Sequence, residues 1–148
     1  NNMATTTATV SISSADLMPG SPLNITANTN LTKAGLTTGL TQMETGFISV
    51  VTGTEYRLGP LATQMAGDAH DIASYLYVCN KTTEDATYYV DWGINETMIG
   101  RLYAGDWMFI PWNANDDAAE IEIEPQNGTN IIEYAFFNSD FILATAAS

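Results

Sequence analysis

The residues of this chain that are best suited to chemistry are carboxylates, and they concentrate in one stretch. Residues 115–125 read NDDAAEIEIEP and carry five acidic side chains: Asp116, Asp117, Glu120, Glu122 and Glu124. Clustered carboxylates can bind a divalent cation, and a pair of them can cleave a glycosidic bond. Both chemistries compete with a simpler interpretation, in which the stretch is the polar face of a β-strand.

A calcium loop is the first possibility. Counted from Asn113, oxygen-bearing side chains stand at positions one, three and five (Asn113, Asn115, Asp117), and Glu124 stands at position twelve. This is the ligand spacing of an EF-hand. Ala118, however, occupies position six, where the sharp turn needs Gly, and strand-like alternation continues where a helix should begin. We therefore expect no metal site, with Asn113, Asn115 and Asp117 as weak candidate ligands.

The alternation itself predicts a strand. Side chains on a strand point to opposite faces in turn. Ile121 and Ile123 are therefore expected in the core. On the other side we expect one row of Glu120, Glu122 and Glu124, facing solvent or lying on an edge that their charge keeps from pairing.

No catalytic constellation accompanies these acids. The single histidine, His70, lies in GDAHD beside Asp68 and Asp71, where residues that cap a turn are a simpler explanation than a metal site. Cys79 lies in an apolar run and is expected to be a buried, inert thiol. The chain has no G-x-S-x-G, P-loop or Rossmann glycine pattern. We expect no enzyme and no cofactor, and keep a glycosidase or other hydrolase as a minor alternative.

Composition excludes further classes of function. The 148 residues carry 17 acidic and four basic side chains, a net charge of −13. The basic residues are scattered: Lys33, Arg57, Lys81 and Arg101. Nucleic-acid binding is not expected, because phosphate neutralisation supplies much of its affinity. No apolar run reaches the roughly 18 residues of a membrane span, and NNMATTTATV lacks a signal-peptide pattern, so we expect neither membrane insertion nor export.

Period-two alternation predicts an all-β fold. ATVSISS and PLNITAN alternate early in the chain, and later runs such as YLYVCN, TYYVDWGI and NIIEYAFFN are rich in aromatic and branched residues. Turn-type clusters such as KTTED and PQNGT separate them. Short strands about ten residues apart indicate an antiparallel, jelly-roll-like β-sandwich of eight to ten strands with almost no helix. We assign residues 1–9 to a flexible, extended N-terminal arm and residues 10–148 to a single sandwich domain.

Longer stretches carry a resemblance to a known family. SPLNITANTNLTKAGLTTGL (21–40), YLYVCNKT (75–82) and IGRLYAGDWMFIPWNANDDAAEIEIEPQNGTNIIEYAFF (99–137) resemble virion structural proteins of tailed bacteriophages, especially marine and cyanobacterial ones. Residues 41–72 contain no such motif. The resemblance implies a β-sandwich present in many copies on the virion, as a capsid decoration or cement protein that clamps the shell from outside. It implies as partners the major capsid protein and copies of the chain itself, in a homotrimer assembled in the host cytoplasm, and it brings no catalytic residues.

Interface candidates follow from this expectation. Trp107 and Trp112 are possible anchors, since large aromatic residues dominate interface energetics. They are five positions apart, so a regular strand points them to opposite faces, and we expect at least one of them outside the core. Near the arm, which can add a strand to a neighbour, Val10 and Ile12 are the candidates. The alternative is a carbohydrate- or receptor-binding module on a tail or fibre, with exposed aromatic residues beside the loop at 113–117.

Overall fold

The protein is described by a computed structural model that covers residues 5–32, 39–40, 42–58, 73–83, 86–113, 121–138 and 145–147. Within these ranges there are eleven strands and no helix. They are β1 (Thr6–Ser14), β2 (Leu23–Leu31), β3 (Gln42–Val51), β4 (Tyr56–Leu58), β5 (Ala73–Asn80), β6 (Tyr89–Ile94), β7 (Thr97–Tyr103), β8 (Trp107–Asn113), β9 (Ile121–Pro125), β10 (Thr129–Asn138) and β11 (Thr145–Ala147). The expected all-β class is confirmed, with one strand more than the largest number expected.

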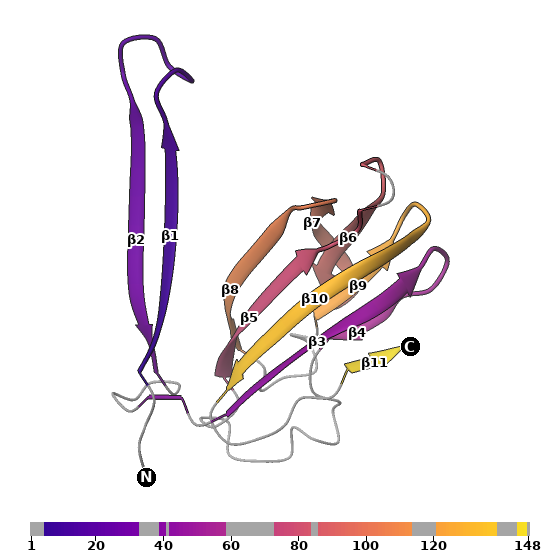
Figure 1. The fold of residues 1–148 in the computed structure, drawn as a ribbon. Helices are drawn as coiled ribbons and strands as arrows, with labels where there is room; N and C mark the ends of the chain where they lie inside the picture. Colours follow the sequence, from indigo (N-terminus) through magenta and orange to yellow (C-terminus); the bar gives the residue numbers. More distant parts are fainter. Residues whose placement is uncertain are drawn as a thin grey trace.

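Two antiparallel sheets form the body of the molecule. One has four strands in the order β3-β10-β5-β8, and the other has five in the order β11-β4-β9-β6-β7. They pack in a sandwich-like arrangement (Figure 1), which confirms the expected antiparallel β-sandwich. In the four-stranded sheet the inward positions are even-numbered, as at Val50, Leu76, Met108 and Phe136, all members of the core cluster. Odd-numbered residues of these strands therefore face away from the core.

The core is aliphatic with a few aromatic rings. Its largest fully buried apolar side chains are Phe136, Leu58, Leu76, Ile121, Ile123 and Ile132. Full burial of such a side chain contributes about 1.5–3 kcal/mol. Trp112 belongs to this core: it is 4% exposed, and its ring centroid lies 5.9 Å from that of Phe136.

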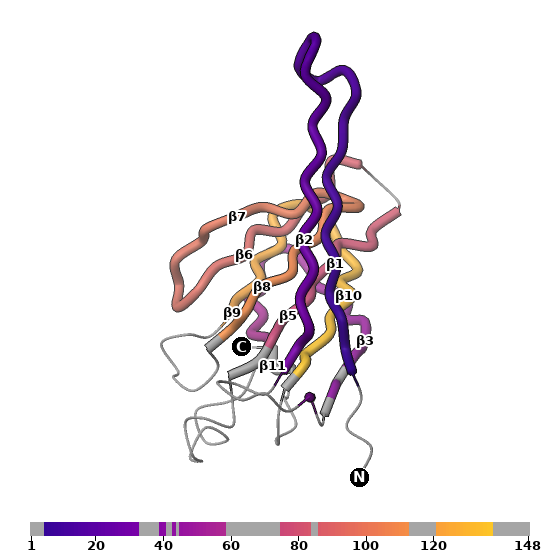
Figure 2. Tube along the Cα trace, turned by 90° about the vertical axis from the view of Figure 1, so that its left-hand side faces the viewer, coloured from indigo at the N-terminus to yellow at the C-terminus, as the bar shows by residue number. Residues whose placement is uncertain are grey.

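β1 and β2 form a separate two-stranded hairpin. Their register runs from Thr6 opposite Leu31 to Ser14 opposite Leu23. Figures 1 and 2 show the hairpin beside the four-stranded sheet and reaching well past the end of the sandwich. The alternating segments around Val10 and Ile25 are thus strands, as expected. The extended N-terminal arm is not confirmed: residues 1–4 lie outside the described ranges, and Thr6–Thr9 form the first half of β1.

The acidic strand differs from its expected form. Ile121 and Ile123 are fully buried in the core, which confirms that part of the prediction. Glu122 faces the other way but is also fully buried, so the expected solvent-facing row is wrong at this position. Its carboxylate is covered at the β6–β7 turn, where the Glu96 N–H donates to Glu122 Oε2 over 2.6 Å. β9 lies between β4 and β6, so it is not an edge strand. Glu120 lies outside the described residues.

A buried polar cluster joins β5 to β10. It consists of Asn80, Thr82 and Asn130, of which Asn80 and Asn130 are fully buried. Asn80 Nδ2 donates to the Leu102 carbonyl (3.1 Å) and to Asn130 Oδ1 (3.2 Å). Thr82 Oγ1 donates to Asn80 Oδ1 over 2.6 Å, and Asn130 Nδ2 donates to the Asn127 carbonyl over 3.0 Å. Because each buried amide is hydrogen-bonded, the cost of burying these polar groups beside β10 is compensated.

Candidate interaction surface

The outer surface of the four-stranded sheet is largely apolar. We call it the aromatic face. The register pairs odd-numbered residues with odd-numbered residues throughout this sheet, so they share one face. Its large apolar residues are Met43, Phe47, Val51, Tyr75, Tyr77, Trp107, Phe109, Ile131 and Phe137. Phe47 is 64% exposed, Met43 63% and Trp107 53%. An apolar patch of this kind on one side of a sheet marks an interaction surface.

The rings of the aromatic face are ordered against each other. Tyr75 and Phe109 stack with their centroids 5.7 Å apart and their planes 7° apart. The ring centroids of Phe109 and Phe137 lie 6.5 Å apart. These side chains come from three neighbouring strands, β5, β8 and β10, so the sheet holds them in fixed positions. Rigid aromatic rings lose little conformational freedom on binding, which favours their use in recognition.

Only one charged side chain is seen among the described outward residues of this sheet. It is Glu133, whose Oε1 accepts a hydrogen bond of 3.1 Å from the Tyr77 hydroxyl. Lys81 Nζ lies 4.0 Å from the same oxygen. Burial raises the pKa of the Tyr77 hydroxyl, and the neighbouring Cys79 and Glu133 raise it further, so Tyr77 stays a neutral donor. The aromatic face is therefore close to neutral.

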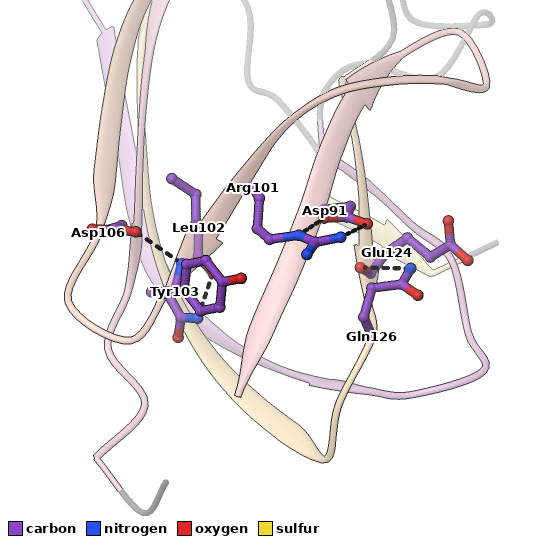
Figure 3. A network of polar contacts seen from close by, with 8 residues as sticks. Asp91, Arg101, Leu102, Tyr103, Asp106, Glu124 and Gln126 are labelled. Carbon is purple, nitrogen blue, oxygen red and sulfur yellow. Dashed lines mark hydrogen bonds and ion pairs between the residues drawn. The ribbon is translucent and has the colours of Figure 1, made fainter. Parts of the chain in front are cut away.

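The outer surface of the five-stranded sheet is charged instead. Its register places Arg57 opposite Glu122, and Glu124 and Arg101 on either side of Asp91. Figure 3 shows the Arg101 guanidinium directed at the Asp91 carboxylate, with Glu124 on the adjoining strand. Arg101 Nε donates to Asp91 Oδ1 over 2.7 Å, and this bond raises the pKa of the guanidinium. The two outer surfaces thus have opposite character.

A cleft separates the hairpin from the aromatic face. Its volume is about 380 Å³. The hairpin wall consists of Thr6, Thr7, Ala8, Thr9, Val10 and Leu31, and the sheet wall of Tyr77, Trp107, Phe109 and Phe137. Figure 2, which views the molecule from the hairpin side, shows the hairpin crossing in front of β5 and β10. The sheet wall is aromatic, the hairpin wall combines three threonines with Ala8, Val10 and Leu31, and the β3 edge of the aromatic face lies outside the cleft.

The structure brings some of the expected interface residues together. Val10 lines the cleft opposite Trp107, and Ile12 lies two residues further along the same hairpin face, 50% exposed. Trp107 and Trp112 point to opposite faces, as expected from their spacing. Trp112 packs in the core, so only Trp107 is accessible to a partner.

The expected metal ligands are not brought together by any described contact. Asn113 ends β8 without a described side chain, and Asn115 and Asp117 lie outside the described residues, as does His70. In the part of the chain that the structure describes, no group of three or more His, Cys, Asp or Glu side chains is arranged to hold a metal ion. Cys79 is 4% exposed, which agrees with the expected buried thiol. The described residues include no helix that is long and apolar enough to cross a membrane.

Sequence reasoning missed Met43, Phe47 and Val51. They lie in METGFISVV (43–51), in the region without a recognisable motif. A signal was present: Phe47 and Val51 stand at odd positions, while Ile48 and Val50 stand at even positions. A strand that is apolar on both faces is expected to be covered on both faces. The run therefore indicated a second buried surface, in addition to the core.

No protein-family model matches the chain, and no curated protein matches it either.

Proposed function

We propose that this chain is a non-enzymatic structural protein of a tailed-phage virion, a capsid decoration protein that binds the outer surface of the head and stabilises the shell. Its partners in this proposal are the major capsid protein and neighbouring copies of the chain, arranged as a homotrimer. Assembly takes place in the host cytoplasm. The proposal starts from the sequence resemblance given above, and physical features of the molecule support it.

The observation that carries the proposal is the amount of ordered apolar surface outside the core. The aromatic face and the hairpin together expose Ile12, Leu17, Met18, Ile25, Met43, Phe47, Val51, Trp107 and Ile131. A protein that works alone in water has little use for so much exposed apolar area, whereas one that is held between neighbours requires it. A decoration protein that binds the capsid and its own neighbours is a protein of this second kind.

We further infer that the sandwich is a jelly roll, the finer form of the fold. The support is the pairing of its eight central strands: β3 pairs with β10, β4 with β9, β5 with β8 and β6 with β7. Each pair encloses the next, so the chain wraps like a folded ribbon, as jelly rolls do. Viral capsid domains and lectins share this architecture, so it agrees with a decoration protein and with a sugar-binding module alike.

In this proposal the N-terminal arm is the whole β1–β2 hairpin instead of residues 1–9 alone. The hairpin is amphipathic, and it is the only described part of the chain that leaves the sandwich. An arm of this shape can reach a neighbouring subunit, which suits a protein that joins others on a surface.

The test separates heads from tails. Virions of the phage that encodes the chain are disrupted and fractionated, and the protein is quantified in each fraction by mass spectrometry. We expect it with the heads, at a constant ratio to the major capsid protein. Heads from a gene-deletion phage should bind added protein saturably and then release DNA at a higher temperature. Absence from both fractions would refute the proposal.

The second candidate is a carbohydrate- or receptor-binding module of a tail or fibre. The cleft favours it, because Trp107, Phe109 and Tyr77 line one wall and three threonines are among the residues of the other, and aromatic rings beside polar residues suit a sugar ring. This candidate predicts recovery in the tail fraction and binding to a glycan array. Trp107→Ala should then abolish glycan binding while the core, to which Trp107 does not belong, stays folded.

A further inference from the structure

The two faces of the β1–β2 hairpin differ in chemistry. One face, which we call the hairpin apolar face, carries Ala8, Val10, Ile12, Leu23, Ile25, Ala27 and Leu31, together with Thr6, Ser14 and Thr29. The other face consists only of hydroxyl and amide side chains: Thr7, Thr9, Ser11, Ser13, Asn24, Thr26, Asn28 and Asn30. Thr9 Oγ1 donates to Asn28 Oδ1 over 2.8 Å across the strands. The polar face can remain in contact with water, whereas the hairpin apolar face is expected to pack against another apolar surface.

The distal half of the hairpin apolar face lacks that cover. Ile12 and Ile25 are directly opposite each other and are 50% and 49% exposed. Figures 1 and 2 show that the turn end of the hairpin reaches past the end of the sandwich. A two-stranded hairpin on its own is at best marginally stable in water. Its length and regular register are therefore best explained by a surface that covers it in the assembled protein.

The turn that joins β1 to β2 is held by hydrogen bonds. Ser14 Oγ accepts a hydrogen bond of 3.0 Å from the Leu17 N–H. The Ser21 N–H donates to the Met18 carbonyl over 3.1 Å, and Gly20 has a φ of 78°, as a type II turn requires at its third residue. These bonds hold the turn in one conformation, which lowers the entropic cost of docking.

The molecule also carries an uncovered surface of matching chemistry. It is the β3 side of the aromatic face, where Met43, Phe47 and Val51 are 63%, 64% and 48% exposed. None of these three lines the cleft under the hairpin of the same chain. We propose that the hairpin apolar face of one copy docks on the aromatic face of a second copy.

Two observations favour a second copy over another partner. Within one chain the proximal half of the hairpin apolar face already faces the aromatic face across the cleft, where Val10 and Leu31 line one wall and Trp107 and Phe109 the other, so both walls carry apolar side chains. The second is charge. Each copy has a net charge of −13, yet residues 5–32 contain a single charged side chain, Asp16. Copies that repel each other elsewhere can approach through these near-neutral surfaces.

The contact area agrees with an exchange of hairpins. A strand of nine residues is about 30 Å long, and two strands with their side chains are about 10 Å wide, so a whole hairpin that leaves the cleft of its own chain covers about 300 Å² of its partner. Counting both surfaces, one docking buries about 600 Å². A copy in the proposed homotrimer takes part in two dockings, one through its hairpin and one through its aromatic face, and together these bury about 1,200 Å², the lower end of stable interfaces. Each copy is therefore expected to give one hairpin and to receive one.

Docking between copies rests on the proposed function, which names neighbouring copies of the chain as partners. The test uses the isolated protein, so a failure of the copies to associate and a failure to bind phage heads are separate results. Sedimentation velocity measures self-association of the full chain. Ile12→Asn with Ile25→Asn, the hairpin variant, should raise the dissociation constant at least about tenfold, because two apolar side chains lose their burial. Ser11→Asn with Thr26→Asn alters a facing pair on the polar side and should associate like the unaltered chain.

A mixing experiment identifies the surfaces. Met43→Ser with Phe47→Ser, the sheet variant, should also fail to associate, and circular dichroism should show that both variants keep the sandwich. Mixed together, the two variants should associate more strongly than either variant alone, through one intact contact, the hairpin of the sheet variant on the sheet of the hairpin variant. A monomeric unaltered chain, dissociation of the polar-side control, or a mixture that associates no more than the separate variants would each overturn the inference.

Discussion

Removal of the Asn130 amide is expected to destabilise the sandwich far more than its size suggests. In Asn130→Ala, Asn80 Nδ2 keeps its bond to the Leu102 carbonyl but loses its second acceptor, Asn130 Oδ1 at 3.2 Å. One buried N–H is then left without a partner. The carbonyl of Asn127, which loses the Asn130 donor, belongs to an exposed residue, so water can replace that bond.

The magnitude follows from these contacts. An unpaired buried donor costs about 1–3 kcal/mol. The space left by a fully buried side chain adds about 1 kcal/mol, since the surrounding structure closes only in part. We therefore expect Asn130→Ala to lower the free energy of unfolding by about 2–4 kcal/mol, a large share of the roughly 5–15 kcal/mol typical of a domain.

Urea unfolding followed by tryptophan fluorescence measures this change. The matched control is Asn28→Ala on the hairpin, which also removes the acceptor of a hydroxyl hydrogen bond, from Thr9 at 2.8 Å, but in an exposed position. It should change the free energy of unfolding by less than about 0.5 kcal/mol. The slope of the denaturant dependence should be the same for both variants and the unaltered chain, because the surface exposed on unfolding is nearly unchanged.

A double substitution distinguishes the proposed cause from a simple loss of packing. Asn80→Ala also removes the donor that Asn130→Ala leaves unpaired. The combined variant should therefore be about 1–2 kcal/mol more stable than the sum of the two single effects predicts. Additive effects, or an Asn130→Ala effect no larger than that of Asn28→Ala, would show that the buried cluster does not stabilise the fold in the way described.

Three other substitutions test local features of the sandwich. Gly93→Ala, at the β-bulge in β6, should destabilise by at least about 2 kcal/mol in urea unfolding, because its Cβ meets the Thr97 carbonyl. Glu96→Gly should stabilise by about 1 kcal/mol, since Glu96 has a φ of 63°. Burial and Glu122 raise the Glu55 pKa, so folding stability falls as pH rises from the unfolded value of 4.5 through the raised pKa. Glu55→Gln should therefore stabilise the protein at pH 7 and lose this advantage below pH 4.5.

Controls separate these causes from general effects. Gly53→Ala meets nothing within 4 Å and should cost only the strain of its positive φ, so an equal effect at Gly93 would contradict the steric argument. Glu96→Ala removes the charge but keeps a side chain in the left-handed region, and it should stabilise less than Glu96→Gly. Asp16→Asn removes one charge from the exposed hairpin turn; if it matches Glu55→Gln across the pH range, net charge alone accounts for the effect.

The strands were predictable because their signal is local. Alternation placed Ile121 and Ile123 in the core without knowledge of any other strand, and it placed Trp107 and Trp112 on opposite faces. The burial of Glu122 was not predictable in this way. Its cover comes from the turn that contains Glu96, 26 residues away in the sequence. The alternation of residues within one strand does not indicate which distant turn will cover that strand.

The hairpin shows a second limit of local patterns. The segments around Val10 and Ile25 were recognised as half-buried strands, but alternation states only that one face needs a cover, not which surface supplies it. In the structure the two segments pair with each other and stand apart from the sandwich. The aromatic face has the same ambiguity, because Phe47 is as apolar as Ile48 on the opposite side of β3. Whether such a face is covered by the same chain or by another is decided by the length and path of the connecting segments.

The distribution of charge links the fold to the proposed assembly. The outward side of the five-stranded sheet carries charges of both signs, Asp91, Glu124 and the buried Glu122 beside Arg57 and Arg101, while the only charged side chain among the described outward residues of the aromatic face is Glu133, already bonded to Tyr77. Of the 17 acidic residues of the chain, the described outward residues of the aromatic face and the hairpin therefore hold two, Glu133 and Asp16. Repulsion between copies is consequently low where these two surfaces meet. Copies can approach through them while the acidic residues elsewhere in the chain oppose other contacts, so the same charge that keeps the protein soluble also limits how it can assemble.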